Sequence, residues 1–308
     1  MSPLRQALAD YLTLRRALGY GLVRSEKLLN QFLDHLEGSG AATVTIERAL
    51  SWARLSAHGC VNWWAHRLSV VRGFAAYLHT VDPNTEIPPT DLLPSRSHRA
   101  NPYLYSDDDI AALLAATASL STPLRQATFR TLIGLLTVTG MRIGEAIHLD
   151  RDDIDFTAGL LLVRRSKFGK SRELVLHPTT LRALAQYARR RDRRHTTAPT
   201  PARFISTAGT RLLYCNVQWT FQRLVRQVGL TARSSSCRPR IHDLRHSFAV
   251  RSMLDAYAAG KDGQITLTLL STYLGHVDPA ATYWYLSASP ELLAVAAQRL
   301  EHHLGGRP

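Results

Sequence analysis

The sequence predicts a mainly α-helical protein with one small β-sheet, divided into an N-terminal helical domain and a larger α+β domain. Apolar residues recur at helical spacing through the first ninety residues and again after Leu213. A proline-rich run from Val81 to Pro102 interrupts this periodicity. Two short β-prone stretches flank a basic, glycine-containing turn in the second half.

The first domain is expected over residues 1–82. Its apolar positions recur every three or four residues in stretches separated by glycines, as a bundle of about four helices requires. These positions are Leu4, Leu8, Tyr11 and Leu12; Leu29, Phe32, Leu33 and Leu36; Ile46, Ala49, Leu50 and Ala53; and Val61, Trp64, Leu68, Val71, Ala75 and Leu78.

An interdomain linker is expected over residues 83–102, because this segment is rich in proline and small polar residues. The second domain is then expected over residues 103–308. Ser106 is followed by three aspartates, which is typical of a helix N-cap with acidic residues in the first turn.

Further elements of the second domain follow from local composition. A helix is expected over 127–139, ending at Gly140, and a β-hairpin from Leu160–Val163 and Glu173–Leu176. Phe204–Ser206 is a candidate third strand. A last helix is expected after Ser289 as N-cap, with Pro290 at its first position.

The charge favours a polyanionic partner. Lys and Arg number 38 against 24 Asp and Glu, a net charge of +14, and most of the excess lies after Ala100. Nucleic acid is the most frequent partner of such a chain, although a membrane surface or solubility alone would give the same balance. No apolar stretch is as long as a membrane-spanning helix, and the N-terminus lacks a secretory signal, so a cytoplasmic, nucleoid-associated protein is expected.

Cysteine and histidine usage favours neither a disulfide framework nor a metal site. Cys60, Cys215 and Cys237 are odd in number and widely separated. The adjacent His302 and His303 fit a solvated helix end better than a metal site. We therefore expect no metal and no cofactor.

His242 and Arg245 stand three residues apart in IHDLRHSFAV and would share one helix face. An arginine offers a planar fork to two phosphate oxygens, and a histidine can donate a hydrogen bond or move a proton. Arg142, in TGMRIGEAIH, lies between apolar neighbours, so either Glu145 or a phosphate must meet its charge. Taken alone, His242 and Arg245 at this spacing are more typical of a solvated helix face than of a binding site.

Lysine is scarce in this chain, at four of 38 basic residues, and Lys167 and Lys170 both lie in the hairpin turn. Lysine, unlike arginine, can give up a proton when its pKa is lowered. His276 is followed by Tyr283 and Tyr285, each of which alone would be read as a core tyrosine. Together these residues suit attack on a phosphodiester by a tyrosine hydroxyl.

The second domain resembles the catalytic domain of the tyrosine recombinases, the phage-integrase family. The T-G-x-R-x-x-E motif is matched by Thr139, Gly140, Arg142 and Glu145, and the hairpin lysine by Lys167. The H-x-L-R-H box is matched at 242–246 and the L-G-H box at 274–276. Tyr285 lies nine residues after His276, as the family nucleophile does, whereas Tyr283 lies at seven and fits worse.

The resemblance implies an α+β catalytic domain preceded by a helical, SAM-like core-binding domain, and an enzyme that works without metal or ATP. Tyr285 would attack the scissile phosphate and form a 3′-phosphotyrosyl link. By the same resemblance, Arg142 and Arg245 would neutralise the phosphate and His276 would donate a hydrogen bond to it. Lys167 would protonate the leaving 5′-oxygen, His242 would be the acid/base partner, and Glu145 would support the pocket.

The expected partner is double-stranded DNA at a specific recombination site. Candidate phosphate contacts come from the basic runs of the second domain: Arg190, Arg191, Arg193, Arg194, Lys170, Arg238 and Arg240. The family also implies a homotetramer in the synaptic complex, with sister recombinases as further candidate partners. The apolar residues after Ser289 suit packing on a neighbour and packing within the chain equally.

Two rival functions share much of this pattern. A type IB topoisomerase uses the same tyrosine chemistry, but the helical bundle and the complete L-G-H box favour a recombinase. A DNA-binding accessory or regulatory protein needs only the charge and the helices, whereas this chain also has the full set of candidate catalytic residues. Among recombinases, a transposon or integron-like enzyme, a phage integrase and a chromosome-dimer resolvase stay open, in integration, excision or transposition, and TYWYL favours a mobile-element enzyme of the transposase type.

Overall fold

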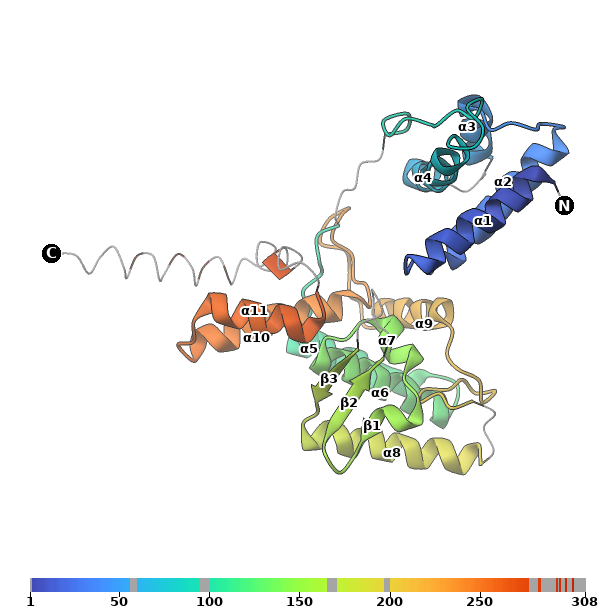
Figure 1. Cartoon of the computed structure of the whole chain (residues 1–308). Helices are drawn as coiled ribbons and strands as arrows, with labels where there is room; N and C mark the ends of the chain where they lie inside the picture. The colour runs from blue at the N-terminus through green and yellow to red at the C-terminus, as the bar shows by residue number, and fades with distance from the viewer. Residues whose placement is uncertain are drawn as a thin grey trace. The chain divides into compact units, whose positions relative to one another are not determined.

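A computed structural model describes residues 2–55, 60–94, 100–164, 171–196 and 200–276, with single positions 282, 283, 292, 294, 297 and 301. The chain divides into two compact units, Met1–Arg99 and Ala100–Pro308 (Figure 1). In the described part of the chain, none of the helices combines the length and apolar character that crossing a membrane requires.

The first unit contains the expected helical bundle. Its helices are α1 (Pro3–Ala17), α2 (Val23–Gly38), α3 (Ile46–Arg54) and α4 (Val61–Leu78). Phe32 and Leu33 of α2 pack with Phe74 of α4 in a fully buried core. The apolar stripe of each segment is thus largely the face that the helix buries, although Val61 at the start of α4 is 40% exposed.

The expected linker begins as part of this unit. The amide of Glu86 donates to the carbonyl of Val44 at 2.9 Å, and the guanidinium of Arg72 donates to the carbonyl of Pro88 at 2.6 Å. Leu93 is buried in the helical core. The described residues after Pro83 therefore pack on the first unit up to Pro94, and Ala100 already belongs to the second.

The second unit combines helices with a small antiparallel sheet, as expected. Its helices are α5 (Asp107–Ala116), η1 (Thr117–Ser119), α6 (Pro123–Thr139), α7 (Ile143–His148), η2 (Arg151–Asp153), α8 (Pro178–Arg194), α9 (Tyr214–Gln227), α10 (Asp243–Ala258) and α11 (Gly263–Leu274). The Ser106 cap is confirmed, because its hydroxyl accepts from the amide of Asp109. Residues 228–242, which were expected to be helical, contain no helix.

The sheet has the order β1 (Ile154–Asp155), β2 (Leu160–Val163) and β3 (Arg172–Val175). The hairpin is confirmed, with Val163 paired to Arg172 at the end next to the turn. The prediction of a strand at Phe204–Ser206 is wrong: Ile205 forms only an isolated bridge with Arg211, and β1 provides the third strand. Two residues were too few for their alternation to predict β1.

Helix α6 lies at the centre of the second unit, between α8 and α10 (Figure 1). It ends as expected at Gly140, which has the left-handed φ of +58°. Helices α10 and α11 share a separate apolar cluster with Leu292, which is 5% exposed. At least this residue of the C-terminal segment therefore packs within its own chain, while the expected helix after Ser289 lies mostly outside the described residues.

Candidate active site

Arg245 joins the ends of two helices. Its guanidinium, 2% exposed, donates from Nη1 to the carbonyl of Gly140 at 2.8 Å and from Nη2 to the carbonyl of Leu274 at 2.7 Å. These carbonyls lie at the C-termini of α6 and α11, where helix dipoles favour a cation. A Cβ at Gly140 would come within 2.4 Å of the Phe248 ring, so both the backbone conformation and the packing require glycine there.

His276 lies directly beside this arginine. Its Nε2 is 2.9 Å from Nη2 of Arg245, and its Nδ1 is 2.7 Å from the hydroxyl of Thr282. Because a guanidinium only donates, Nε2 must accept, and Nδ1 then carries the proton and donates to Thr282. Burial and then the positive charges of Arg245 and Arg142 lower the pKa of His276 to about 4. The imidazole is therefore neutral at pH 7.

Arg142 reaches the same place from the start of α7. Its amide and its Nη1 donate to the two carboxylate oxygens of Glu145 at 2.8 and 2.9 Å, and its Nη2 donates to the carbonyl of Gly275 at 3.3 Å. Leu274 and Gly275 are neighbours, so Arg142 and Arg245 both bind the C-terminus of α11. The T-G-x-R, H-x-L-R-H and L-G-H segments are thus assembled around two guanidinium groups.

Glu145 is the acidic centre of this cluster, with a side chain 6% exposed. It also accepts from Nη1 and Nη2 of Arg172, at 3.1 and 2.8 Å. Burial alone would raise the pKa of Glu145, but Arg172 and then Arg142 outweigh it and hold the pKa below its ordinary value. The carboxylate is therefore ionised and stabilises both arginines, consistent with a supporting role.

Arg172 was missed at the level of sequence. It stands among other basic residues beside the hairpin turn, where a solvated side chain is the ordinary expectation. Nothing in its sequence context distinguished Arg172 from these neighbours, because Arg142 alone already balances the charge of Glu145.

His242 stands at the N-terminus of α10 and contacts the ring of His246 edge-on, with centroids 5.2 Å apart. The surrounding protein and then Arg245 and Arg240 lower the pKa of His242, although part of its side chain reaches solvent. His246 is buried, and burial followed by the nearby charges lowers its pKa to about 3. The two imidazoles lie within the same cationic cluster as His276.

The arginines that were expected to contact phosphates differ in their exposure to solvent. Arg190, Arg193, Arg194 and Arg238 are exposed. Arg191 is corrected: it is 2% exposed, and its guanidinium donates to the carbonyl of Arg203 at 3.0 Å and to Asp192 at 2.8 Å. Arg240 is half-buried and forms an ion pair at 2.8 Å with fully buried Asp243.

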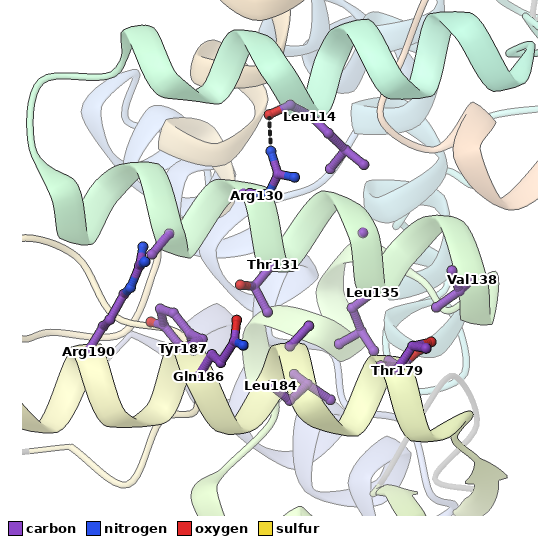
Figure 2. A pocket seen from close by; sticks show the side chains of 14 residues that line it. Leu114, Arg130, Thr131, Leu135, Val138, Thr179, Leu184, Gln186, Tyr187 and Arg190 are labelled. Atoms are coloured by element: carbon purple, nitrogen blue, oxygen red, sulfur yellow. Dashed lines mark hydrogen bonds between the residues drawn. The ribbon is translucent and has the colours of Figure 1, made fainter.

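Helix α8, which carries four of these arginines, lies along the edge of the unit opposite α7, α10 and α11 (Figure 1). Between α6 and α8 is a cavity of about 320 Å³. Figure 2 shows that Arg190 reaches from α8 toward α6 there, while Arg130 donates to the carbonyl of Leu114 at 3.2 Å. This cavity is separate from the cluster around Arg245.

Three expected site residues, Lys167, Lys170 and Tyr285, lie outside the described residues. Tyr283, the second candidate nucleophile, is described and is 53% exposed. The described residues thus bring together Arg142, Glu145, His242, Arg245 and His276. Two guanidinium groups and neutral imidazoles at one position form a site suited to a single phosphodiester anion.

The sequence is similar to those of known proteins. The sequence model described as "Phage integrase family" matches residues 104–291. A protein named as an integrase/recombinase, y4rB of Sinorhizobium fredii, is 44% identical over 308 residues, covering 98% of both chains. Tyrosine recombinase XerC of Alcanivorax borkumensis is 30% identical over 218 residues, covering 71% of this chain and 66% of XerC.

Solved structures share the fold. The Tn1549 transposon integrase, in complex with transposon right-end DNA, aligns with a TM-score of 0.60 at 17% identity, covering 96% of this chain and 99% of that one. A lambda integrase tetramer bound to a Holliday junction gives a TM-score of 0.60 at 18% identity, covering 92% and 76%. At these identities the likeness establishes the fold alone.

The fold and the cluster of arginines and histidines define an enzyme that cleaves and rejoins DNA, a tyrosine recombinase. The chain belongs to the phage integrase family, as its sequence motifs predicted.

Proposed function

We propose that this protein is a site-specific recombinase in which Tyr285 attacks the scissile phosphate. Its oxygen would form a bond to phosphorus while the bond to the 5′-oxygen breaks, giving a 3′-phosphotyrosyl link and a 5′-hydroxyl. A 5′-hydroxyl from a partner duplex would then attack that link and release the tyrosine. One phosphoester bond forms for each that breaks, so the exchange needs no external energy source.

The arrangement of Arg245 carries this proposal. A buried arginine held by the carbonyls of Gly140 and Leu274 is fixed in place before any DNA binds. Fixed cations aimed at a phosphate stabilise the charge of the pentavalent transition state without having to reorganise. Arg142, held by Glu145 and Gly275, would supply the second guanidinium. Lys167 would protonate the leaving 5′-oxygen.

The two histidines would handle protons. His242 would accept the proton of the tyrosine: desolvation by the surrounding protein and then the cations around it keep the imidazole unprotonated before DNA binds, and the arriving phosphate anion would raise its pKa and stabilise the imidazolium. His276 would bind a phosphate oxygen through Nε2, which in the DNA-free protein accepts from Arg245. To donate to the phosphate, Nε2 must carry a proton. That proton could move from Nδ1 or be newly bound, and new binding is favoured because an arriving phosphate raises the pKa of His276.

The DNA partner follows from charge and family. We propose that residues 1–82 and 103–308 form two DNA-binding domains around one duplex, with exposed arginines, Lys170 and the half-buried Arg240 contacting phosphates. A tetramer at a specific site, assembled with identical or sister subunits, would exchange strands in integration, excision or transposition of a mobile element. The integrase/recombinase relative and the DNA-bound tetramer of lambda integrase support this proposal. Such a reaction would occur on DNA in the cytoplasm.

Covalent trapping tests the proposal. Nicked duplexes taken from the DNA that flanks the gene would be incubated with wild type, Tyr285→Phe and Tyr283→Phe, and protein–DNA bands resistant to SDS would be scored. We expect wild type and Tyr283→Phe to trap and Tyr285→Phe not to trap. Trapping by Tyr285→Phe but not by Tyr283→Phe would move the nucleophile to Tyr283, and a wild type that binds these duplexes without trapping would overturn the proposed activity.

A further inference from the structure

Arg172 is the first residue of β3 and connects three parts of the catalytic unit. Its Nη1 and Nη2 form a two-pronged pair with Glu145, and its Nε donates to the carbonyl of Tyr273 at 2.9 Å. Its side chain is 13% exposed. One guanidinium thus links the sheet, helix α7 and the C-terminal turn of α11.

We infer that Arg172 is a positioning residue for DNA cleavage, acting through Glu145 on Arg142 and through the end of α11 on His276. This inference rests on the proposed function, because it assigns Arg172 a part in the same reaction. Arg172 is not proposed to touch the phosphate, because its described hydrogen bonds go to Glu145 and to the carbonyl of Tyr273.

Arg172 is connected to Arg142 through hydrogen bonds to the same carboxylate. Each oxygen of Glu145 accepts one bond from Arg172 and one from Arg142. Without Arg172, the carboxylate would keep its bonds to Arg142 but could turn about its own side-chain torsions. Because a displacement of about 1 Å at a reacting group can reduce a rate by about 100-fold, removal of Arg172 is expected to slow chemistry.

The path to His276 runs through the turn after α11. Gly275 has a φ of +68°, and a Cβ there would lie 3.2 Å from Nη1 of Arg172. The guanidinium therefore packs directly against the backbone of Gly275, which precedes His276. It also binds the carbonyl of Tyr273, two residues before Gly275. Lysine could not reproduce this arrangement, because a single ammonium lacks the planar fork and the separate Nε donor.

The same residue also closes the hairpin. Arg172 pairs with Val163, and the sequence between them contains Lys167, the proposed acid. The strand that leads out of the lysine turn is therefore fixed to the pocket that holds Arg142.

The test compares Arg172→Gln and Arg172→Lys with Arg211→Gln. Arg211 is a matched control, because it is also a partly buried arginine that pairs with a carboxylate, Asp150, and donates to a backbone carbonyl, that of Ile147. On the nicked duplexes, we expect the single-turnover cleavage rate of Arg172→Gln to fall about 10- to 100-fold while the Kd for DNA changes by less than about 3-fold. Arg172→Lys should recover part of the rate, and Arg211→Gln should cleave normally.

A double-mutant cycle separates positioning from simple destabilisation. Because Arg172 acts in part through Glu145, the loss of rate in the double variant Arg172→Gln, Glu145→Gln should be smaller than the sum of the two single losses. Additive losses, or an equal rate loss in Arg211→Gln at matched melting temperature, would overturn the inference.

A second measurement does not depend on cleavage and so distinguishes this inference from the proposed function. His276 faces Arg245, Arg142, Arg172 and His242, and these charges add to burial in lowering its pKa. In an NMR titration with the signal identified from His276→Gln, we expect the pKa of His276 to rise in Arg172→Gln and to stay unchanged in Arg211→Gln. An unchanged pKa in Arg172→Gln would contradict the inference even if wild type cleaves DNA.

Discussion

Arg245 of α10 and Arg191 of α8 are equally buried, each 2% exposed, but they face different groups. Arg191 pairs with a carboxylate, that of Asp192, and donates to a carbonyl of its own region. The described hydrogen bonds of Arg245 go to two helix C-termini and an imidazole, which are neutral acceptors. Burial is therefore common to both arginines, and the surroundings distinguish the one suited to a phosphate.

The difference extends to the regions around them. Helix α8 ends in exposed arginines, whose positive charge is favourable in the last turn of a helix without any ligand. The pocket around Arg245 gathers cations from α7, α10 and β3 although like charges repel. Convergence of cations from separate elements is thus stronger support for an anion site than a run of arginines along one helix.

The largest expected effect is a loss of DNA cleavage when Arg245 is changed, compared with the same change at Arg191. Arg245→Lys should lower the rate of covalent trapping by about 100- to 1,000-fold, because a compact ammonium lacks the planar fork that spans the two carbonyls and reaches a phosphate oxygen. Arg191→Lys should lower the melting temperature but leave the cleavage rate of folded protein unchanged. Equal losses of cleavage in the two variants, measured at matched folded fraction, would remove the distinction between the two regions.

Local features of the catalytic unit could be predicted from sequence because they depend on neighbouring residues. Ser106 and the acidic turn after it predicted the start of α5, and Gly140 predicted the end of α6. Ordered motifs also predicted that Arg142 and Arg245 serve one site. The signals for α5 and α6 lie within a few positions of the residues concerned, whereas the shared site of Arg142 and Arg245, about a hundred residues apart, was implied by the resemblance to a family.

Features that depend on distant contacts could not be predicted in this way. Arg172 is 27 residues from Glu145 and about a hundred from Tyr273, and its sequence neighbours resemble those of any basic turn. Arg191 lies in a run of arginines, so only the fold could show that it turns inward while its neighbours reach solvent. For charged residues, sequence gives the number of charges and the fold gives their partners.

A smaller effect is expected in the pH dependence of stability, where buried His246 of the catalytic pocket should differ from an exposed histidine. The pKa of His246 is lowered to about 3 by burial and then by His242, Arg240 and Arg245, despite Asp243 at 3.8 Å. The unfolded chain therefore binds a proton here below pH 6.5 that the folded protein does not. Stability should be full above that pH and fall toward pH 3, with a contribution from His246 of about 2 kcal/mol lost at pH 5.

Urea unfolding of wild type and His246→Gln at pH 7.5 and pH 5 measures this contribution. The drop in unfolding free energy between the two pH values should be smaller in His246→Gln than in wild type. His148→Gln, which changes an exposed histidine, should retain the wild-type drop. If His246→Gln loses as much stability as wild type, the pocket does not hold that imidazole neutral.

The smallest effect is expected at the end of α8, where Arg190, Arg193 and Arg194 would be changed together to Gln. If these arginines bind phosphates, the slope of log binding constant against log salt should become less steep by about 1 for each phosphate that is no longer neutralised. The cleavage rate of bound DNA should stay unchanged, since α8 and the catalytic pocket lie on opposite edges of the unit (Figure 1). An unchanged slope would mean that these arginines only complement the end of their own helix, and phosphate binding would then have to come from the side that bears Arg238.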